Sequence, residues 1–297
     1  MNYRHAYHAG NFADCFKHAL LLLLLRAMRR KEKPFLALDT HAGRGRYDLS
    51  GKAACKTGEW RQGIGRLREA HPSALAEYLA CIESLGIESL GIESLGIESL
   101  GIESLGLYPG SPVIIRSVLR PQDRLIACEL NKEEAAALRR EMAVGAMMKN
   151  IAVHERDGYA ALRAFLPPPE KRALILIDPP FEQPDEFAIA AESLAGAWEK
   201  FPQGVYALWY PIKHRAPVRD FFETLRRSAI RDAIACELLL REPVNPARLN
   251  GCGLLIVNPP YGFEAEATPV LRALRDTLGD ALGDGGATVS IERVIDE

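Results

Sequence analysis

Residues 174–181 (Leu-Ile-Leu-Ile-Asp-Pro-Pro-Phe) combine the chemical groups needed to act on an aromatic amine. The N6 amine of adenine is a poor nucleophile, because its lone pair is delocalised into the ring. The Asp178 carboxylate and the Pro179 carbonyl can accept both N6 hydrogens and favour a tetrahedral nitrogen for in-line methyl transfer, without a metal. Phe181 can stack on an unpaired or flipped base. The plainer interpretation is a strand that ends at prolines beside a core aromatic ring.

A second segment fits the same pattern, since residues 257–261 read Val-Asn-Pro-Pro-Tyr. It follows the sixth or seventh predicted strand. The methyl-transfer loop should instead follow the fourth strand, where Asp178 stands. We therefore interpret residues 258–261 as a strand end with prolines.

Residues 39–45 (Asp-Thr-His-Ala-Gly-Arg-Gly) follow the first predicted strand, at the end where doubly wound sheets bind ligands. Because Gly43 has no side chain, the backbone there can approach a ligand closely. The segment lacks the third glycine of the G-x-G-x-x-G dinucleotide fingerprint. It resembles the D/E-x-x-x-G-x-G loop with which class I methyltransferases wrap the methionine and ribose parts of S-adenosylmethionine. The alternative is a tight turn that holds no ligand.

Two more acids stand where such a cofactor needs them. Glu129 ends the next predicted strand and is suited to bind ribose hydroxyls through charge-assisted hydrogen bonds. Asp157 and Gly158 follow the strand after that, where an acid reaches the amino group of the cofactor adenine. Either acid alone is more often a helix N-cap or a surface charge.

The elements that must position these residues alternate between strands and helices, which predicts an α/β fold with a doubly wound, Rossmann-like parallel sheet. We expect strands at residues 35–39, 125–129, 151–154, 174–177, 205–210, 234–240 and 253–257. We expect helices at residues 11–30 and 131–148, after the turn 108–112, and near 184–200 and 217–228. The helix 11–30 is apolar all round and should be buried. The last two strands are close in sequence and can form an antiparallel edge hairpin.

The pentapeptide Ile-Glu-Ser-Leu-Gly occurs five times in tandem between residues 82 and 106. A five-residue period keeps its leucines on no single face of a helix or strand. We interpret the array as a low-complexity expansion in a surface insertion, partly helical or mobile, without a catalytic role.

Composition limits the class of protein. The chain has 297 residues, of which 48% are hydrophobic, and its net charge is -2. No apolar stretch approaches the roughly 20 residues that span a bilayer, so we expect a cytoplasmic protein that binds no membrane. The six cysteines form no C-x-x-C pair, which argues against a zinc site. Basic residues at 26, 29, 30, 31, 33, 44 and 46 offer a local nucleic-acid patch, although a solvated helix end is the simpler interpretation.

Five segments together resemble the RlmJ family, which are bacterial 23S rRNA adenine-N6 methyltransferases. They are residues 3–11 (Tyr-Arg-His-Ala-Tyr-His-Ala-Gly-Asn), 39–47, 108–112 (Tyr-Pro-Gly-Ser-Pro), 176–181 and 207–211 (Ala-Leu-Trp-Tyr-Pro). The resemblance extends to residue 290 and implies a monomeric class I methyltransferase that modifies one specific adenine of 23S rRNA. It implies a methyltransferase domain formed by residues 1–48 and 108–297, with an inserted helical subdomain at 49–107 that ends in the repeat.

The resemblance also implies roles for individual residues. The S-adenosylmethionine site would be lined by His18, His41, Ser111, Glu129, Asp157, Gly158 and Asp178. Tyr3, His5 and Lys17 would lie near the target adenine or the RNA. Two departures are visible. The pentapeptide array lies at the end of the insertion, and Phe181 stands where tyrosine is commoner.

Three alternatives remain open on the sequence. The same chemistry on DNA is the nearest, because RNA and DNA are separated by 2′-hydroxyl contacts that a sequence does not display. A nucleotide-binding oxidoreductase is disfavoured by the missing third glycine and by the Asp-Pro-Pro-Phe segment. A catalytically silent RNA-binding protein would not need Asp178, Glu129 and Asp157 together.

Overall fold

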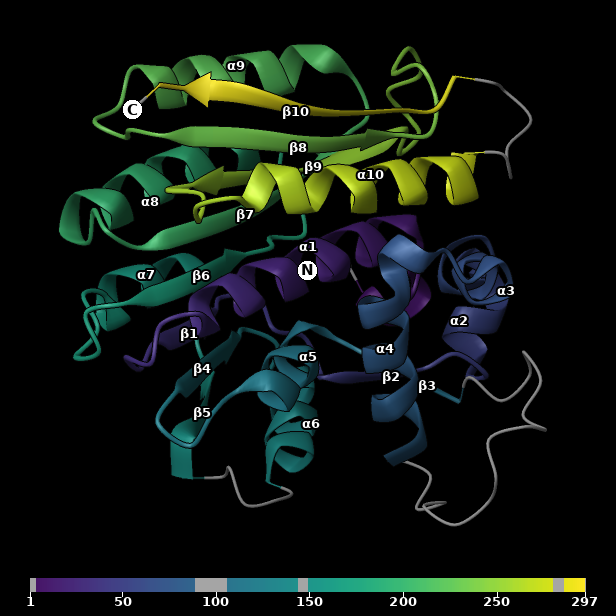
Figure 1. The fold of residues 1–297 in the computed structure, drawn as a ribbon, viewed down its shortest axis with the longest axis horizontal. Coiled ribbons are helices and arrows are strands. Elements are labelled where there is room, and N and C mark those ends of the chain that lie inside the picture. Colours follow the sequence, from purple (N-terminus) through teal and green to yellow (C-terminus); the bar gives the residue numbers. More distant parts are fainter. Residues whose placement is uncertain (1–3, 89–105, 144–148, 280–285, 297) are drawn as a thin grey trace.

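A computed structural model describes residues 4–88, 106–143, 149–279 and 286–296, so that Tyr3 lies outside the described residues. Its main sheet has the strand order β10-β8-β9-β7-β6-β1-β4-β5 (Figure 1). The strands are β1 (Leu36–Asp39), β4 (Arg124–Glu129), β5 (Ile151–Glu155), β6 (Ala173–Ile177), β7 (Val205–Ile212), β8 (Ala233–Leu239), β9 (Gly251–Val257) and β10 (Thr288–Ile295). The predicted doubly wound α/β fold is confirmed.

Five neighbouring strands, from β5 to β7, run parallel, and the remaining pairs are antiparallel. The predicted hairpin of β8 and β9 exists, but it is not the edge of the sheet. Strand β9 lies between β7 and β8, and the edge strand is β10, which was not predicted. The chain moves outward from β1 through β4 to β5 and then returns to the other side of β1 at β6. This reversal places a ligand crevice at the carboxyl ends of β1, β4 and β6.

Helices cover both faces of the sheet. One face carries α1 (Phe12–Arg29), α5 (Ser111–Val118), α6 (Lys132–Met142) and α10 (Phe263–Gly279). The other carries α7 (Gly158–Phe165), α8 (Glu186–Lys200) and α9 (Arg215–Arg226). Successive side chains of a strand point to opposite faces, so Ala37 joins the first core while Leu36 and Leu38 join the second. Within the described residues, no helix is both long enough and apolar enough to cross a membrane.

Helix α1 lies beside α10 and is the most buried helical element near the crevice (Figure 1). Its N-cap, Asn11, accepts hydrogen bonds from the backbone N–H groups of Ala13 and Asp14. Fourteen of its 18 residues are buried, as the leucine run predicts. Three of those buried residues are polar, namely Asp14, Lys17 and His18. Burial of charged groups in an apolar helix requires partners, and these define the site described below.

The segment between β1 and α5 contains a second, two-stranded sheet that was not predicted, formed by β2 (Arg46–Asp48) and β3 (Leu107–Pro109). Between its strands lie α2 (Lys52–Thr57), α3 (Arg66–Ala70) and α4 (Ala76–Glu88). The first pentapeptide belongs to α4, where Ile82 and Leu85 are buried in the same core as α1. The later repeats include residues 89–105, which lie outside the described residues. The division into domains at 48 and 108 stays a prediction.

Candidate active site

The carboxyl ends of four parallel strands meet at one cleft. Sequence-predicted residues that line it are His5, Lys17, His18, His41, Gly43, Ser111, Glu129, Asp157, Gly158, Asp178, Pro179 and Phe181. They come from the N-terminal segment, from α1, from the start of α5, and from the loops after β1, β4, β5 and β6 with the start of α7. The fold therefore brings every described residue of the predicted site to the same cleft.

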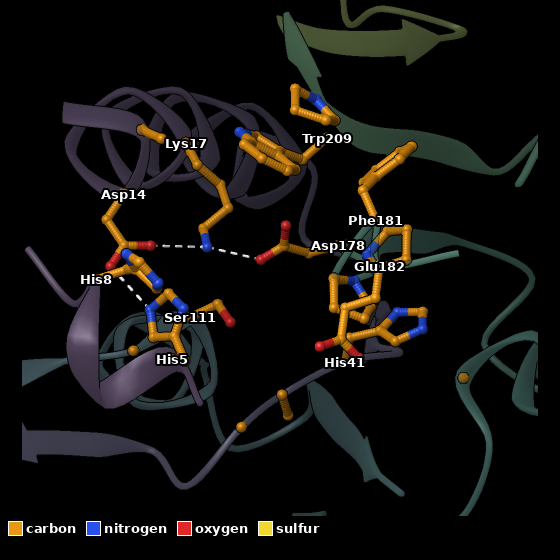
Figure 2. A pocket seen from close by; sticks show the side chains of 18 of the residues that line it. His5, His8, Asp14, Lys17, His41, Ser111, Asp178, Phe181, Glu182 and Trp209 are labelled. Carbon is orange, nitrogen blue, oxygen red and sulfur yellow. Dashed lines mark hydrogen bonds and ion pairs between the residues drawn. The ribbon is translucent and has the colours of Figure 1, made fainter. Parts of the chain in front are cut away.

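Lys17 connects α1 to the loop after β6. Its ammonium nitrogen lies 2.6 Å from Asp178 Oδ2 and 2.9 Å from Asp14 Oδ1. Figure 2 shows Lys17 between these two carboxylates. The Lys17 side chain is only 6% exposed and that of Asp178 16%. Burial alone would lower the pKa of Lys17, but Asp14 and Asp178 raise it well above its usual value. Asp178 Oδ1 accepts no hydrogen bond from the described residues, so one oxygen of this carboxylate is available to a substrate.

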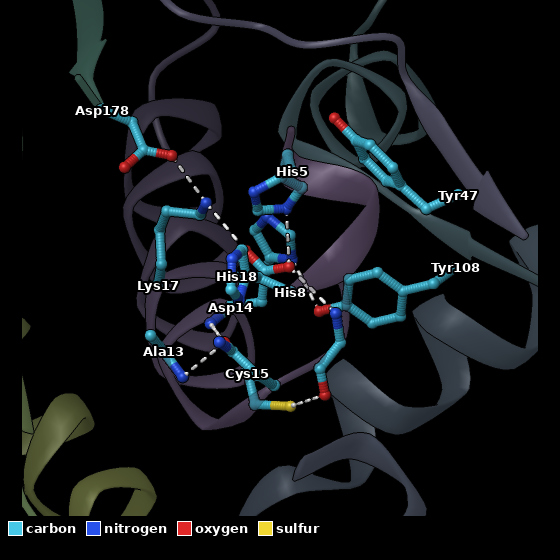
Figure 3. Close-up of polar contacts among 12 residues, drawn as sticks. His5, His8, Ala13, Asp14, Cys15, Lys17, His18, Tyr47, Tyr108 and Asp178 are labelled. Atoms are coloured by element: carbon cyan, nitrogen blue, oxygen red, sulfur yellow. Dashed lines mark hydrogen bonds and ion pairs between the residues drawn. The ribbon is translucent and has the colours of Figure 1, made fainter. Parts of the chain in front are cut away.

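Asp14 also fixes the segment that precedes α1. Its Oδ2 lies 2.9 Å from His5 Nε2 and accepts a hydrogen bond from the Gly10 backbone N–H at 3.0 Å (Figure 3). Burial by itself raises the pKa of Asp14, yet His5 and Lys17 hold it well below its usual value. Asp14 was not predicted as a site residue. The structure shows a buried anion that holds both His5 and Lys17.

The inserted helices hold the other side of the N-terminal segment. The Glu59 carboxylate lies 3.0 Å from His8 Nδ1, and the Asn11 side-chain amide donates to it at the same distance. The hydrogen bond to Glu59 raises the pKa of His8. Gly63 packs so closely that a Cβ there would lie 2.2 Å from the Gly10 carbonyl oxygen. Glu59 lines the cleft and was not predicted.

Backbone hydrogen bonds shape the predicted cofactor loop. Gly43 has a φ of 61° and donates its N–H to Glu129 Oε2 at 3.0 Å. A Cβ at Gly43 would lie 2.1 Å from the Tyr47 hydroxyl, so only glycine fits here. The other Glu129 oxygen accepts the Asn131 N–H at 2.7 Å. Glu129 thus ends β4 as predicted, and its burial raises its pKa.

Two buried polar groups flank this loop. Ser111 donates its hydroxyl to Asp39 Oδ2 at 2.7 Å, and burial raises the pKa of Asp39 to about 7. His18 Nδ1 lies 2.8 Å from the Tyr108 hydroxyl, and burial lowers the pKa of His18 to about 3, so its ring is neutral. Asp39 Oδ1 and His18 Nε2 are buried without a partner among the described residues. Unpaired buried polar atoms beside a cleft fit a polar ligand.

The Asp157 carboxylate is the N-cap of α7, because it accepts the Ala160 N–H at 2.8 Å. Asp157 is therefore a helix N-cap, which was one interpretation of the sequence, and it also lines the cleft. Gly158 allows the close approach of His41, since a Cβ at Gly158 would lie 2.5 Å from the His41 ring. Burial lowers the pKa of His41 to about 4, so this ring too is neutral.

An aromatic group stands beside Asp178. Phe181 has a φ of 49°, which is rare for a residue other than glycine and is characteristic of functional loops. Its ring centroid lies 4.7 Å from that of Phe187 and 5.9 Å from that of Trp209. Trp209 faces the cleft from β7 and was not predicted as a site residue (Figure 2). Together these rings form an apolar wall on which a base can stack.

The second Asn-Pro-Pro-Tyr segment lies at the wrong edge of the sheet. Strand β9 is antiparallel to β7, and Val257 pairs with Tyr206 near the beginning of β7. Asn258 accordingly donates to the carbonyls of Pro202 and Gly204, at the edge opposite to Asp178. Strand order already disfavoured this segment as the methyl-transfer loop, and the direction of β9 gives the physical reason.

The predicted basic patch is divided: residues 26–33 lie at and after the carboxyl end of α1, whereas Arg44 lines the cleft. Arg26 pairs with Glu77 and Glu266, and Arg30 pairs with Glu266. Arg44 and Arg46 pair with Glu134 and Glu141. Four of the seven basic residues are thus paired with carboxylates, and for residues 26–33 the simpler interpretation as a solvated helix end fits better. In the described part of the chain, no group of three His, Cys, Asp or Glu residues is placed to hold a metal ion.

Comparison with known proteins gives one consistent family. The sequence model of the family described as "Ribosomal RNA large subunit methyltransferase D, RlmJ" matches residues 32–291. Ribosomal RNA large subunit methyltransferase J of Haemophilus influenzae is 35% identical, over 94% of each chain. The protein of the same name from Escherichia coli is 35% identical over 98% of each chain. A crystal structure of a protein from Legionella pneumophila is 36% identical, with a TM-score of 0.81 over 96% of this chain and 98% of that one.

Proposed function

The chain belongs to the RlmJ family of ribosomal RNA large subunit methyltransferases, and from this premise we propose that it methylates the N6 amine of an adenine in 23S rRNA, with S-adenosylmethionine as donor. The observation that carries the proposal is the position of Asp178. This carboxylate ends β6 at the cleft, with one oxygen held by Lys17 and the other available.

The geometry suits an amine that donates two hydrogen bonds while it attacks and then loses one proton. Asp178 Oδ1 and the Pro179 carbonyl accept the two N6 hydrogens and turn the nitrogen lone pair toward the methyl group. Lys17 orients the carboxylate through Oδ2, so that it presents Oδ1 in one position. Phe181 holds the plane of the base by stacking, and Trp209, whose ring is inclined by 66° to that of Phe181, borders the same space from β7.

The residues around the cofactor loop fit S-adenosylmethionine. This cofactor supplies an electrophilic methyl group when it is bound. Glu129 would bind the ribose hydroxyls, and Asp157 would accept from the adenine amino group of the cofactor with the oxygen that does not cap α7. The unpartnered His18 Nε2 is suited to bind a polar atom of the methionine part. Gly43 and Gly158 keep the walls of this site free of side chains.

The test is transfer of labelled methyl from S-adenosylmethionine to unmodified 23S rRNA and, in parallel, to DNA of matched sequence. We expect label in RNA alone. Label in DNA alone would keep the chemistry and overturn the substrate. Saturable cofactor binding with no transfer to either polymer would favour the catalytically silent RNA-binding alternative.

A further inference from the structure

A second wall of the cleft is built from segments that the proposed chemistry does not use. Strand β7 is parallel to β6, so its carboxyl end, followed by Lys213, lies at the same edge as Asp178. Strand β8 runs in the same direction as β7, because both are antiparallel to β9. The segment 240–250, which joins β8 to β9, therefore projects from this edge too. Lys213, Arg241 and Arg248 all line the cleft.

This wall has a fixed shape, because Asn250 joins its two parts. Asn250 is 1% exposed, and its side-chain amide donates to the Lys213 carbonyl at 2.8 Å and to the Asn245 carbonyl at 2.9 Å. Its backbone N–H donates to the Ile212 carbonyl at 3.0 Å. Arg241 donates to the Leu249 carbonyl, which closes the segment on itself. The connection is thus tied to the end of β7.

The charge on this wall is of one sign. Among the described residues from β7 onward that line the cleft, Lys213, Arg241 and Arg248 are basic and none is acidic. Lys213 and Arg248 are exposed, and neither forms an ion pair with a described residue. The lining on α8 and in the loop before it carries Glu182, Glu186, Glu192 and Glu199, together with Lys200 and with Arg163 of α7. A polyanion in the cleft is therefore attracted to the basic wall and repelled by these carboxylates.

We propose that Lys213, Arg241 and Arg248 bind backbone phosphates of the RNA strand next to the target nucleotide. This inference rests on the proposed function, since it takes RNA as the substrate. Along β7, Trp209 and Pro211 lie between these basic groups and Asp178. The RNA strand therefore crosses the end of β7, and its target base turns toward Phe181. Phosphate contacts fix the register of a strand without reading its bases.

The test compares the variant Lys213→Ala/Arg248→Ala with Arg219→Ala/Arg227→Ala, a control that removes two exposed charges of α9 and its end outside the cleft. Binding of an in vitro transcript of 23S rRNA is measured between 50 and 300 mM KCl. We expect the Lys213/Arg248 variant to bind roughly tenfold more weakly, and the slope of log affinity against log salt to fall by about 1.4. The affinity for S-adenosylmethionine and the melting temperature should stay as in the wild type.

A salt slope equal to that of the wild type would overturn the inference, as would an equal change in the α9 control. Failure of the proposed function is a separate outcome. A wild-type chain that binds the transcript and methylates nothing would refute the proposed activity. A reduced slope in the Lys213/Arg248 variant would support the phosphate wall even then.

Discussion

The Lys17 ammonium lies 2.6 Å from Asp178 Oδ2, across 161 positions of sequence, and the same nitrogen lies 2.9 Å from Asp14 Oδ1. The predicted catalytic loop and the N-terminal segment are therefore parts of one polar network. His5 is attached to this network through Asp14, and His8 and Asn11 are attached to the inserted helices through Glu59. The network explains why α1, otherwise apolar, buries charges at the end that faces the cleft.

Replacing Lys17 should harm both stability and activity. Lys17→Met leaves two carboxylates without their cation, one of them in Asp14, whose side chain is 3% exposed. Loss of one partner from a buried pair costs about 3–5 kcal/mol. Chemical denaturation should show a loss of that order, together with a large fall in methyl transfer.

The double variant Asp14→Asn/Lys17→Met separates the two effects. Asparagine removes the uncompensated charge and keeps an oxygen for the Gly10 N–H. Stability should recover in part, while methyl transfer stays low because Asp178 is no longer oriented. Recovery of full activity in the double variant would show that Lys17 matters only for folding.

Glu59 should affect catalysis by positioning the N-terminal segment, without contacting the reacting groups. Glu59→Ala frees His8 and Asn11 and allows the segment that carries His5 to shift. Displacements of about 1 Å near a reacting centre cost up to roughly a hundredfold in rate, so kcat/KM for rRNA should fall by tenfold or more. Cofactor affinity, measured by calorimetry, should not change. Glu77→Ala is the matched control, since Glu77 pairs with Arg26 away from the cleft, and an equal loss there would contradict this positioning role.

Phe181→Ala should weaken binding of the RNA more than binding of the cofactor. Stacking of a base on an aromatic ring is worth about 1–3 kcal/mol, which corresponds to a rise in KM for RNA of roughly 5- to 150-fold. Phe181→Tyr keeps the ring and should retain most activity. Separate titrations with S-adenosylmethionine and with rRNA measure the two affinities, and an equal loss in both would argue against stacking.

Stability should depend on pH through Asp39. Burial raises the pKa of Asp39 to about 7 in the folded protein, so the folded state holds this proton to a higher pH than the unfolded chain does. The contribution of this proton to the free energy of unfolding is present in full below about pH 4 and is lost as the pH rises through 7. Asp39→Asn removes this loss and can still accept from Ser111. Its advantage over the wild type should grow by on the order of 3 kcal/mol between pH 5 and pH 8. A constant difference in unfolding free energy would contradict the assignment.

The strand ends could be predicted from sequence because they depend on local patterns. Apolar runs that end at Asp39, Glu129 and Asp178 specify buried strands, and parallel strands place their carboxyl ends at one edge. These three acids accordingly lie where sequence analysis expected them.

The remaining site residues depend on packing between distant segments. Asp14 and Lys17 are three residues apart on an apolar helix, a spacing that signals a buried pair, but their partner Asp178 is set by the fold. Glu59 gives no such signal, because its contacts arise only where the insertion packs against residues 8–11. The antiparallel insertion of β9 beside β7 was equally hidden, although it decides that Asn258 lies away from the cleft.

The proposed activity depends most on Asp178 acting at an adenine N6 amine. The most direct measurement is mass spectrometry of the nucleosides of 23S rRNA after reaction with the wild-type chain and, in parallel, with Asp178→Ala. We expect N6-methyladenosine with the wild type, and a rate lower by at least about a hundredfold in a variant that folds and still binds the transcript. A methyl group at any other position, or full activity in Asp178→Ala, would contradict it.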